Sequence, residues 1–312
     1  MIYAYRFEGQ STEIIEDHER LAEASWIDVV EPTEEEWALA SAFVSHQLNE
    51  EEDADEIEAS TRSFVDERGI HLSTLFLHQV EGKPENTSVT LMLSKECLVT
   101  VHDRDVPALR LLRMRVRRRG VLLADPLALL AGLFEIAVED LGDTLQEIYR
   151  DLEETSYLVL EDPEGDLEDS LERIAAHENL NGKVRLCLMD ARRDIAFLLR
   201  STQASKTCAK RMKFVLSEID ALLPHNNFLF EKVNFLLQAA QGFINIEQNK
   251  IIKIFSVAAA AFLPPTLIAS IYGMNFDDMP ELHWVFGYPL ALVAMVVSAV
   301  VPVLYFKRKG WL

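Results

Sequence analysis

Basic residues are scarce in this chain of 312 residues, because 30 Lys and Arg stand against 51 Asp and Glu. Nucleic-acid binding needs a positively charged surface, so the formal net charge of −21 argues against a nucleic-acid partner and is better suited to binding cations. Cysteine is also rare: Cys97, Cys187 and Cys208 lack the spacing of a metal site or a disulfide framework. We expect three free thiols in a reducing compartment.

The sequence lacks the short motifs that identify many enzymes. It has no glycine-rich phosphate loop, no nucleophile elbow and no paired-histidine metal motif. His71 and His78 are the nearest pair, and their odd separation on one strand would place them on opposite faces. The opening residues, MIYAYRF, are too short for a secretory signal and lack a cleavage site. The sequence therefore predicts no enzyme and no signal peptide.

Apolar residues are concentrated near the end of the chain. Residues 251–312 hold three acids and four bases, a net charge of +1, whereas residues 1–250 hold 48 acids and 26 bases, a net charge of −22. Residues 254–272 and 284–306 contain no charged residue. As helices these runs would measure roughly 28 and 34 Å, enough to cross the hydrocarbon core of a bilayer. The sequence predicts two transmembrane helices.

Basic residues beside the two runs predict their orientation. They precede the first run and follow the second, and residues 273–283 between the runs contain neither Lys nor Arg. The positive-inside rule then places both chain ends in the cytoplasm and the short loop outside. The alternative is a buried hairpin of a soluble protein, which the absence of a polar stripe disfavours. The flanking bases are Lys250, Lys253, Lys307, Arg308 and Lys309.

The first part of the chain mixes strand and helix patterns. Thr33, followed by three glutamates, predicts the start of a helix. We expect a cytosolic α/β domain over residues 1–124. Runs rich in β-branched and aromatic residues predict strands over residues 3–7, 26–30, 63–65, 71–80, 88–93 and 97–102.

From Asp125 onward glycine and proline are sparse and the pattern is helical. Helices over residues 126–160 and 166–199 would form an acidic antiparallel pair within residues 125–205. A third helix begins near Lys206 or, if Pro224 interrupts it, near His225, and continues to Tyr272. We expect residues 206–253 to form a stalk helix and residues 254–312 a transmembrane hairpin. A coiled-coil-like seam is predicted for Leu222, Leu229, Val233, Leu236, Ala240, Phe243, Ile251 and Ile254.

Acidic residues gather in two stretches. Seven of the nine residues 50–58 are acidic, and residues 135–172 contain fifteen acids and a single base, Arg150. Any one of these carboxylates is best explained as solvated surface. So dense a negative field nevertheless repels itself unless cations screen it, and hard divalent cations with oxygen ligands are the natural counterions.

The end of the first apolar run carries the most informative motif, YGMNF over residues 272–276, which is followed by MPEL over residues 279–282. Gly273 allows a helix to end with its carbonyls exposed. The amide oxygen of Asn275 can hydrogen-bond the water shell of a cation that dehydrates reluctantly, as Mg²⁺ does. Taken alone, Gly-Met-Asn would also suit a simple helix cap. Further negative charge at this mouth comes from Asp277, Asp278 and Glu281.

This arrangement resembles the CorA family of magnesium transporters. The likeness rests on the Gly-Met-Asn motif closing the first span, Met-Pro-Glu-Leu after it, Tyr288-Pro289 opening the second span and the ending KRKGWL. It implies a funnel-shaped homopentamer in the bacterial inner membrane, with five first-span helices lining one pore. The sequence independently indicates an oligomer, because two helices cannot enclose a water-lined path.

The resemblance also implies roles for individual residues. Gly273, Met274 and Asn275 match the selectivity motif, whose asparagine ring holds the hydrated ion. Pore-lining positions are matched by Asn249, Ile252, Phe255, Leu263 and Thr266: a polar ring, a two-residue lower hydrophobic gate, a constriction and a polar position. The three apolar residues could instead be ordinary packing residues, and the threonine could satisfy backbone groups freed by Pro264 and Pro265.

Members of the family also sense cytoplasmic Mg²⁺ at carboxylates between subunits. Asp220 and the acids of residues 50–58 are the candidates for this regulatory site, with ordinary surface charge as the alternative for each.

The leading hypothesis is a channel-like transporter for Mg²⁺ influx, which would also admit Co²⁺ and Ni²⁺ and be gated by intracellular Mg²⁺. Its partners would be copies of itself and membrane lipid, and it would need no organic cofactor. One alternative is a zinc transporter of the same family, disfavoured because the eight histidines lack ligand spacing. Another is a membrane-anchored coiled-coil scaffold that transports nothing.

Overall fold

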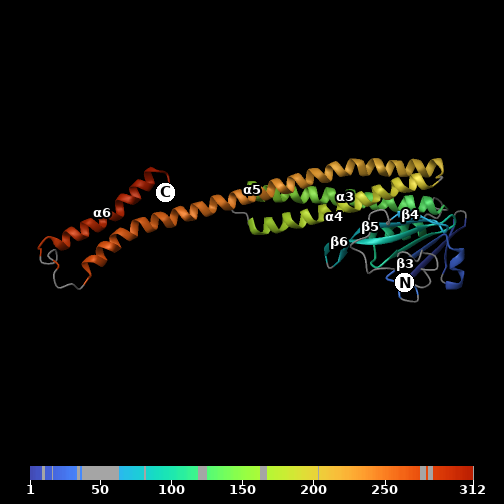
Figure 1. The fold of residues 1–312 in the computed structure, drawn as a ribbon, viewed down its shortest axis with the longest axis horizontal. Coiled ribbons are helices and arrows are strands. Elements are labelled where there is room, and N and C mark those ends of the chain that lie inside the picture. The colour runs from blue at the N-terminus through green and yellow to red at the C-terminus, as the bar shows by residue number, and fades with distance from the viewer. Residues whose placement is uncertain are drawn as a thin grey trace. The chain divides into compact units, whose positions relative to one another are not determined.

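The computed structural model describes residues 1–8, 11–15, 17–33, 36, 63–80, 82–118, 125–161, 167–202, 204–274, 279 and 284–311. The chain divides into two compact units, Met1–Leu236 and Leu237–Leu312. The first unit contains a sheet and helices, and the second contains two long apolar helical segments (Figure 1). Helix α5 (Lys206–Tyr272) contributes residues to both units.

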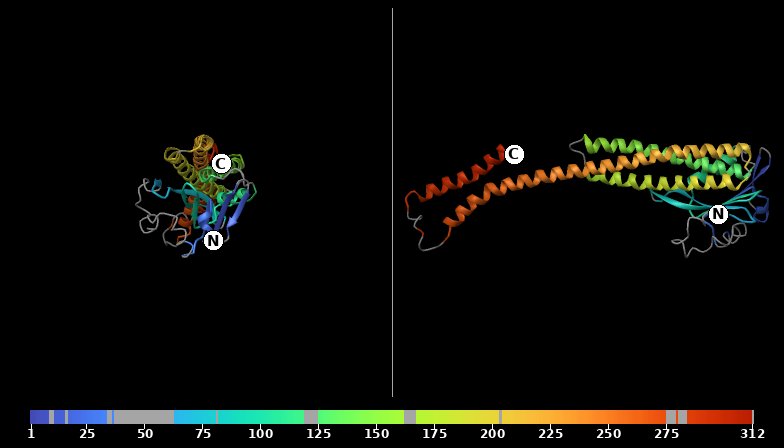
Figure 2. Two further views of the ribbon diagram at one scale, coloured as in Figure 1. Left: turned by 90° about the vertical axis from the view of Figure 1, so that its right-hand side faces the viewer. Right: turned by 45° about the horizontal axis from the view of Figure 1, so that its top comes forward.

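A seven-stranded sheet forms the base of the first unit, with the strand order β2-β1-β3-β7-β6-β5-β4. Strands β3 and β7 run parallel, and the other neighbouring pairs run antiparallel. Helices α3 and α4 cover one face of this sheet (Figures 1 and 2). The strands are β1 (Ile2–Glu8), β2 (Ser11–Ile15), β3 (Trp26–Val30), β4 (Ser63–Val65), β5 (Ile70–Val80), β6 (Lys83–Leu93) and β7 (Leu98–His102).

The predicted strands are all present, and three further elements were not predicted. Strand β6 begins five residues earlier than expected, because its polar first half pairs with β5 in a long hairpin. The edge strand β2 and the helix α2 (Pro107–Arg118) were missed; β2 has only five residues, three of them polar. A short 3₁₀ helix, η1 (His18–Glu23), precedes β3.

The helix start predicted at Thr33 is confirmed by its capping hydrogen bonds. Glu36 N donates to Thr33 Oγ1 at 3.3 Å, and Thr33 N donates to Glu36 Oε2 at 2.9 Å. This reciprocal pair is a capping box, which satisfies two backbone donors that the first turn leaves without partners. The remainder of that predicted helix, together with the acidic stretch 50–58, lies outside the described residues.

A buried carboxylate joins the sheet to helix α2. Asp28 on β3 accepts hydrogen bonds from Thr100 Oγ1 at 2.6 Å and from Arg113 Nη1 at 2.5 Å. His102 Nε2 lies 3.0 Å from the same carboxylate, and Trp26 Nε1 donates to Thr100 Oγ1 at 3.2 Å. Since a buried charge is tolerated only when it is paired and hydrogen-bonded, this network fixes α2 against the parallel strands.

Two long helices follow, α3 (Pro126–Leu160) and α4 (Leu167–Ser201), at nearly the predicted bounds. Asp125 caps α3 by accepting a hydrogen bond from Leu127 N at 3.2 Å, and Pro126 at the first helical position needs no donor. Helix α4 is held to β5 by Asp194, whose carboxylate accepts from Thr74 Oγ1 at 2.5 Å. Burial raises the pKa of Asp194, and these hydrogen bonds oppose that rise.

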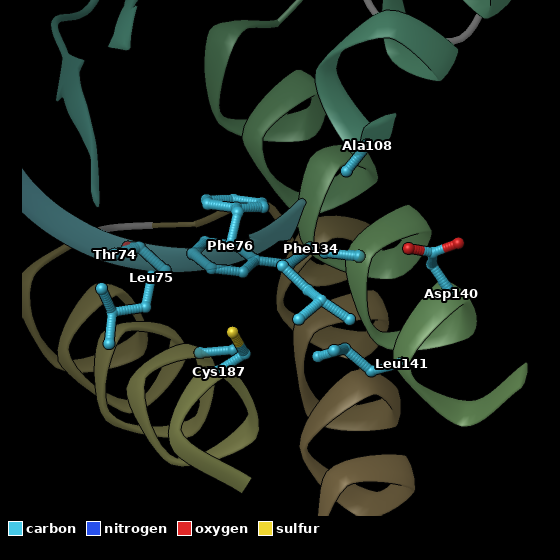
Figure 3. Close-up of a pocket in the computed structure, with 11 residues that line it drawn as sticks. Thr74, Leu75, Phe76, Ala108, Phe134, Asp140, Leu141 and Cys187 are labelled. Carbon is cyan, nitrogen blue, oxygen red and sulfur yellow. The ribbon is translucent and has the colours of Figure 1, made fainter. Parts of the chain in front are cut away.

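Side chains from β5, α2, α3 and α4 meet around a small cavity in the first unit (Figure 3). Phe76 and Phe134 supply aromatic walls, and Cys187 contributes a thiol. Burial raises the pKa of Cys187 to about 12, so this thiol stays protonated at neutral pH. All three cysteines are free, as the sequence predicted.

Helix α5 begins at Lys206 and continues through Pro224, which settles the choice between the two predicted starting points. Proline has no N–H, so the carbonyl of Asp220 loses its usual helical donor. Pro224 is exposed, and water can take the place of that donor on this side of the helix. Within the first unit, the predicted seam residues Leu229, Val233 and Leu236 are buried.

Two buried asparagines connect α4 and α5 within the first unit. Asn226 Nδ2 donates to the backbone oxygen of Asn181 at 2.8 Å and to Asn181 Oδ1 at 2.7 Å. Asn181 Nδ2 donates in return to the backbone oxygen of Asn226 at 3.1 Å. Both side chains are fully buried, so each needs the other to replace water.

We expect Asn226→Ala to destabilise the first unit by about 1–3 kcal/mol, because it leaves buried groups of Asn181 without hydrogen-bond partners. Thermal unfolding of the purified full-length protein should show the loss, at about 2–4 °C per kcal/mol. The exposed Asn234, about two turns farther along α5, is the matched control, and Asn234→Ala should change stability by less than about 0.5 kcal/mol. Equal effects of the two substitutions would contradict the role of the buried pair.

Candidate functional site

Two helices are long and apolar enough to cross a membrane, α5 and α6 (Gly287–Arg308). Their apolar side chains lie mostly exposed in the second unit; in α6 only Gly287 and Ala291 are buried. A hairpin in the core of a soluble protein would instead bury these side chains. The exposure therefore favours surroundings of lipid or of further protein copies.

The hydroxyl residues of the apolar segment of α5 share one side of the helix. At 100° per residue, Ser256, Thr266 and Ser270 fall within a sector of about 80°. All three side chains are exposed. Ser256 and Ser270 were not among the predicted pore-lining residues, although helical spacing alone places them with Thr266. A polar line along an otherwise apolar helix marks the side that faces away from lipid.

The predicted pore-lining residues occupy the same side. Asn249, Ile252, Phe255, Leu263 and Thr266 all fall within a sector of about 120° that contains the hydroxyl residues. The three apolar members are exposed by 60%, 71% and 67% respectively.

Exposure alone does not distinguish this side from the rest of the helix. Ile254 and Phe262, which lie outside this sector, are exposed by 55% and 73%. The assignment of this sector as the pore-lining side of α5 therefore rests on its polar residues.

Thr266 also makes a hydrogen bond within its own helix. Its Oγ1 donates to the carbonyl of Phe262 at 2.7 Å, four residues earlier. The carbonyls that lose donors at Pro264 and Pro265 are those of Ala260 and Ala261, so the alternative role considered for Thr266 does not match this bond. The hydroxyl oxygen keeps acceptor capacity for a second partner.

Asn249 lies in the part of α5 that precedes the apolar segment. Its Nδ2 donates to the backbone carbonyl of Asn245 at 2.8 Å, which orients the side chain along the helix. The side chain is exposed, and its Oδ1 oxygen remains outside that bond. An amide oxygen in this position can accept hydrogen bonds from water bound to a cation.

Helix α5 ends at the Gly-Met-Asn motif. Gly273 N donates to Ala269 O at 2.9 Å, and Met274 N donates to Ile271 O at 3.2 Å, so the last turn tightens before the helix stops. A Cβ atom at position 273 would lie 3.1 Å from Ala269 O, closer than most Cβ contacts. Glycine is therefore the residue that suits this helix end. The other predicted residues of the mouth lie outside the described residues: Asn275, Asp277, Asp278 and Glu281.

The candidate regulatory residue Asp220 has a partner within the chain. Its Oδ1 lies 2.9 Å from Arg192 Nε, and both side chains are about 55% exposed. Over the residues that the structure describes, no three His, Cys, Asp or Glu side chains converge as metal ligands would. A divalent ion at Asp220 would have to compete with Arg192 and to recruit ligands from elsewhere.

Many acids of α3 are paired with bases from other helices. Glu135 accepts two hydrogen bonds from Arg211, from Nε at 2.8 Å and Nη2 at 2.7 Å. Lys232 pairs with Glu153, and Arg173 Nη2 lies 3.3 Å from Glu154. Residues 135–172 contain a single base, but counting bases within this stretch alone underestimates how many of its acids are paired, because α5 supplies partners that are distant in the sequence. Less of the acidic field therefore remains for cations than the sequence suggested.

Comparison with known proteins places this geometry in a family. The family described as "CorA-like Mg2+ transporter protein" matches residues 22–308. Magnesium transport protein CorA of Yersinia pseudotuberculosis is 45% identical over 300 residues, which are 96% of this chain and 95% of that protein. Magnesium transport protein CorA of Escherichia coli (strain K12) is 44% identical over the same shares.

Solved structures agree on the fold. The complete structure of the CorA magnesium transporter from Methanocaldococcus jannaschii matches with a TM-score of 0.78, over 100% of this chain and 99% of that one. At 22% sequence identity this likeness supports the fold alone. The family match over residues 22–308 and the near full-length identity of 45% together show that this chain belongs to the CorA-like Mg²⁺ transporter family.

Proposed function

We propose that this chain is a channel-like Mg²⁺ transporter that carries the ion into the cell across the inner membrane. The observation that carries the proposal is the 45% identity to a magnesium transport protein over 96% of the chain. The functional unit would be a funnel-shaped homopentamer with both chain ends of each subunit in the cytoplasm. Five copies of α5 would then turn their polar sectors toward one central pathway, which a single chain cannot enclose.

The proposed pathway begins at the Gly-Met-Asn motif. Acids of the external loop, Asp277, Asp278 and Glu281, would raise the local concentration of divalent cations. A ring of Asn275 side chains would then hold the ion through its water shell, since Mg²⁺ loses water reluctantly. Met274 beside it would help to shape the ring. Because the amides are neutral, the ion could leave again and conduction could proceed.

Farther along α5, polar and apolar rings would alternate. Thr266 would offer a hydroxyl to the hydrated ion, and Leu263 would form a constriction near it. Toward the cytoplasm, Ile252 and Phe255 would form a lower hydrophobic gate, and Asn249 a last polar ring. Narrow apolar rings resist the passage of water and ions until they widen, which makes them suitable gates.

Entry of the ion needs no nucleotide hydrolysis in this proposal. A divalent ion that crosses a membrane potential of 100 mV gains about 4.6 kcal/mol, twice the value for a single charge. The absence of a phosphate-binding loop from the sequence agrees with transport driven by the potential.

Intracellular Mg²⁺ would close the pore by bridging carboxylates of neighbouring subunits, so that its loss would let repulsion between them favour opening. Asp220 is one candidate ligand, and its pairing with Arg192 suggests that metal binding there would exchange one partner for another. Co²⁺ and Ni²⁺ would follow the same path as Mg²⁺. Transport of Zn²⁺ is the alternative within the family, and ion competition in proteoliposomes would distinguish the two.

Asn275→Ala tests the selectivity ring. Hydrogen bonds to charged groups contribute about 1.5–3 kcal/mol, so Mg²⁺ uptake in a transport-deficient cell should fall roughly ten-fold or more. Ser298→Ala is a suitable control, because it also removes a polar group from the membrane segment, but from α6, where Ser298 Oγ donates to Met295 O at 2.9 Å. Undiminished uptake by Asn275→Ala at equal expression would refute the ring. A scaffold without transport predicts no Mg²⁺ flux from the unchanged protein in liposomes.

Leu263→Ala tests the hydrophobic constriction. Alanine is smaller and less apolar than leucine, so it widens the ring and lowers the barrier to hydration, and Mg²⁺ leak at high internal Mg²⁺ should rise at least about ten-fold. The measurement is flux into proteoliposomes preloaded with Mg²⁺. Phe262→Ala is the matched control, because Phe262 is the next residue, is equally exposed and points about 100° away. Equal leaks from the two variants would contradict the constriction.

A further inference from the structure

An apolar groove lies between α5 and α6 in the second unit. Its walls are formed by Phe262 and Pro265 of α5 and by α6 residues that include Val296, Ala299 and Val303, and no polar atom contributes to its exposed lining. Ala299 is small and leaves room between the helices. A groove of this composition, on a helix pair that crosses a membrane, is suited to a hydrocarbon chain.

The end of α6 nearest this groove has a well-defined cap. Trp311 N donates to Phe306 O at 3.1 Å, and Gly310 N donates to Lys307 O at 3.2 Å. Gly310 has a φ of 70°, so these two bonds form a Schellman motif with glycine in the left-handed conformation. The ring of Trp311 stacks on that of Phe306 with centroids 5.1 Å apart. The cap therefore holds a tryptophan beside the last turn, where an aromatic side chain marks a membrane interface.

Three basic residues belong to the same turn: Lys307, Arg308 and Lys309. All three are exposed, and none forms an ion pair with a carboxylate among the described residues. Lys309 Nζ instead lies 5.4 Å from the ring centroid of Tyr305.

The basic turn continues the wall of the groove. Lys307 follows Val303 by four residues and Val300 by seven, so it lies on the same side of α6 as the two valines that line the groove. Arg308 follows Leu304, another lining residue, by four. The apolar groove therefore ends, along α6, at a cluster of cations that form no ion pair among the described residues.

We propose that this surface binds an anionic phospholipid, with an acyl chain in the groove and the phosphate at Lys307 and Arg308. Basic residues beside membrane helices attract anionic headgroups, and their long aliphatic stems reach the interface while the chain below remains in hydrocarbon. A zwitterionic lipid would fill the groove but would offer no net charge to the two cations. The inference rests on the proposed membrane placement of α5 and α6, but not on any step of ion transport.

Fluorescence quenching of Trp311 tests the site in the full-length protein. With Trp284→Phe as the parent, Trp311 is the only tryptophan in residues 237–312. The parent is reconstituted in mixed vesicles of phosphatidylglycerol and phosphatidylcholine, with brominated acyl chains on one lipid or the other. We expect brominated phosphatidylglycerol to quench with at least roughly five-fold higher apparent affinity, the preference that one basic residue provides at an anionic surface.

Two paired variants separate the headgroup contact from diffuse attraction. Lys307→Gln with Arg308→Gln should abolish the preference, whereas Lys250→Gln with Lys253→Gln removes the same charge from α5 and should leave it intact. Ala299→Leu should fill the groove and reduce quenching by both lipids.

Three results would overturn the proposal: equal quenching by the two lipids in the parent, equal loss in both charge variants, or no effect of Ala299→Leu. The last would indicate that a second copy of the chain fills the groove. Mg²⁺ flux is measured in the same vesicles, so failure of transport would refute the proposed function without affecting the lipid result.

Discussion

In hydrocarbon no water is available to hydrogen-bond the backbone, so a chain segment that crosses it must satisfy its own N–H and C=O groups. Helices α5 and α6 meet this requirement over most of their length, and the exceptions are the prolines within them, Pro302 of α6 among them, and the end of α5. Pro264 and Pro265 remove two donors from α5 more than two turns before Gly273. The helix then stops at Gly273, with a tightened last turn. Backbone carbonyls near the external mouth are therefore available to water and to hydrated cations.

In the first unit, ion pairs between helices determine how much negative charge remains available to bind cations. Glu135 with Arg211 and Glu153 with Lys232 join α3 to α5, and Glu154 with Arg173 joins α3 to α4. Exposed pairs of this kind add little stability, but they lower the net field that cations would have to screen. Regulation by Mg²⁺ would therefore depend on carboxylates that remain unpaired or that exchange partners, and less on the overall excess of acid.

Much of the fold could be predicted because its signals are local. The bounds of α3 follow from Asp125, Pro126 and an uninterrupted helical pattern, and β3 follows from a run rich in aromatic and β-branched residues, WIDVV. What could not be predicted depends on contacts between distant residues. Asn181 and Asn226 are 45 residues apart, and no spacing rule identifies their mutual hydrogen bonds. The continuation of α5 through Pro224 likewise depends on the exposure of that turn to water, which the local sequence does not reveal.

The candidate site combines both kinds of information. Thr266 was predicted from its match to a family position, whereas Ser256 and Ser270 belong to the same sector by helical spacing alone. Asn249 and Gly273 lie at the two edges of the wider sector. If this side of α5 faced lipid, the three hydroxyl side chains would lie in hydrocarbon, whereas the apolar groove side would face protein. If the sector instead faces the same sector of other copies, no polar group of α5 has to lie in hydrocarbon. The groove beside α6 then remains open to lipid, so the arrangement that forms a pore also leaves the lipid site accessible.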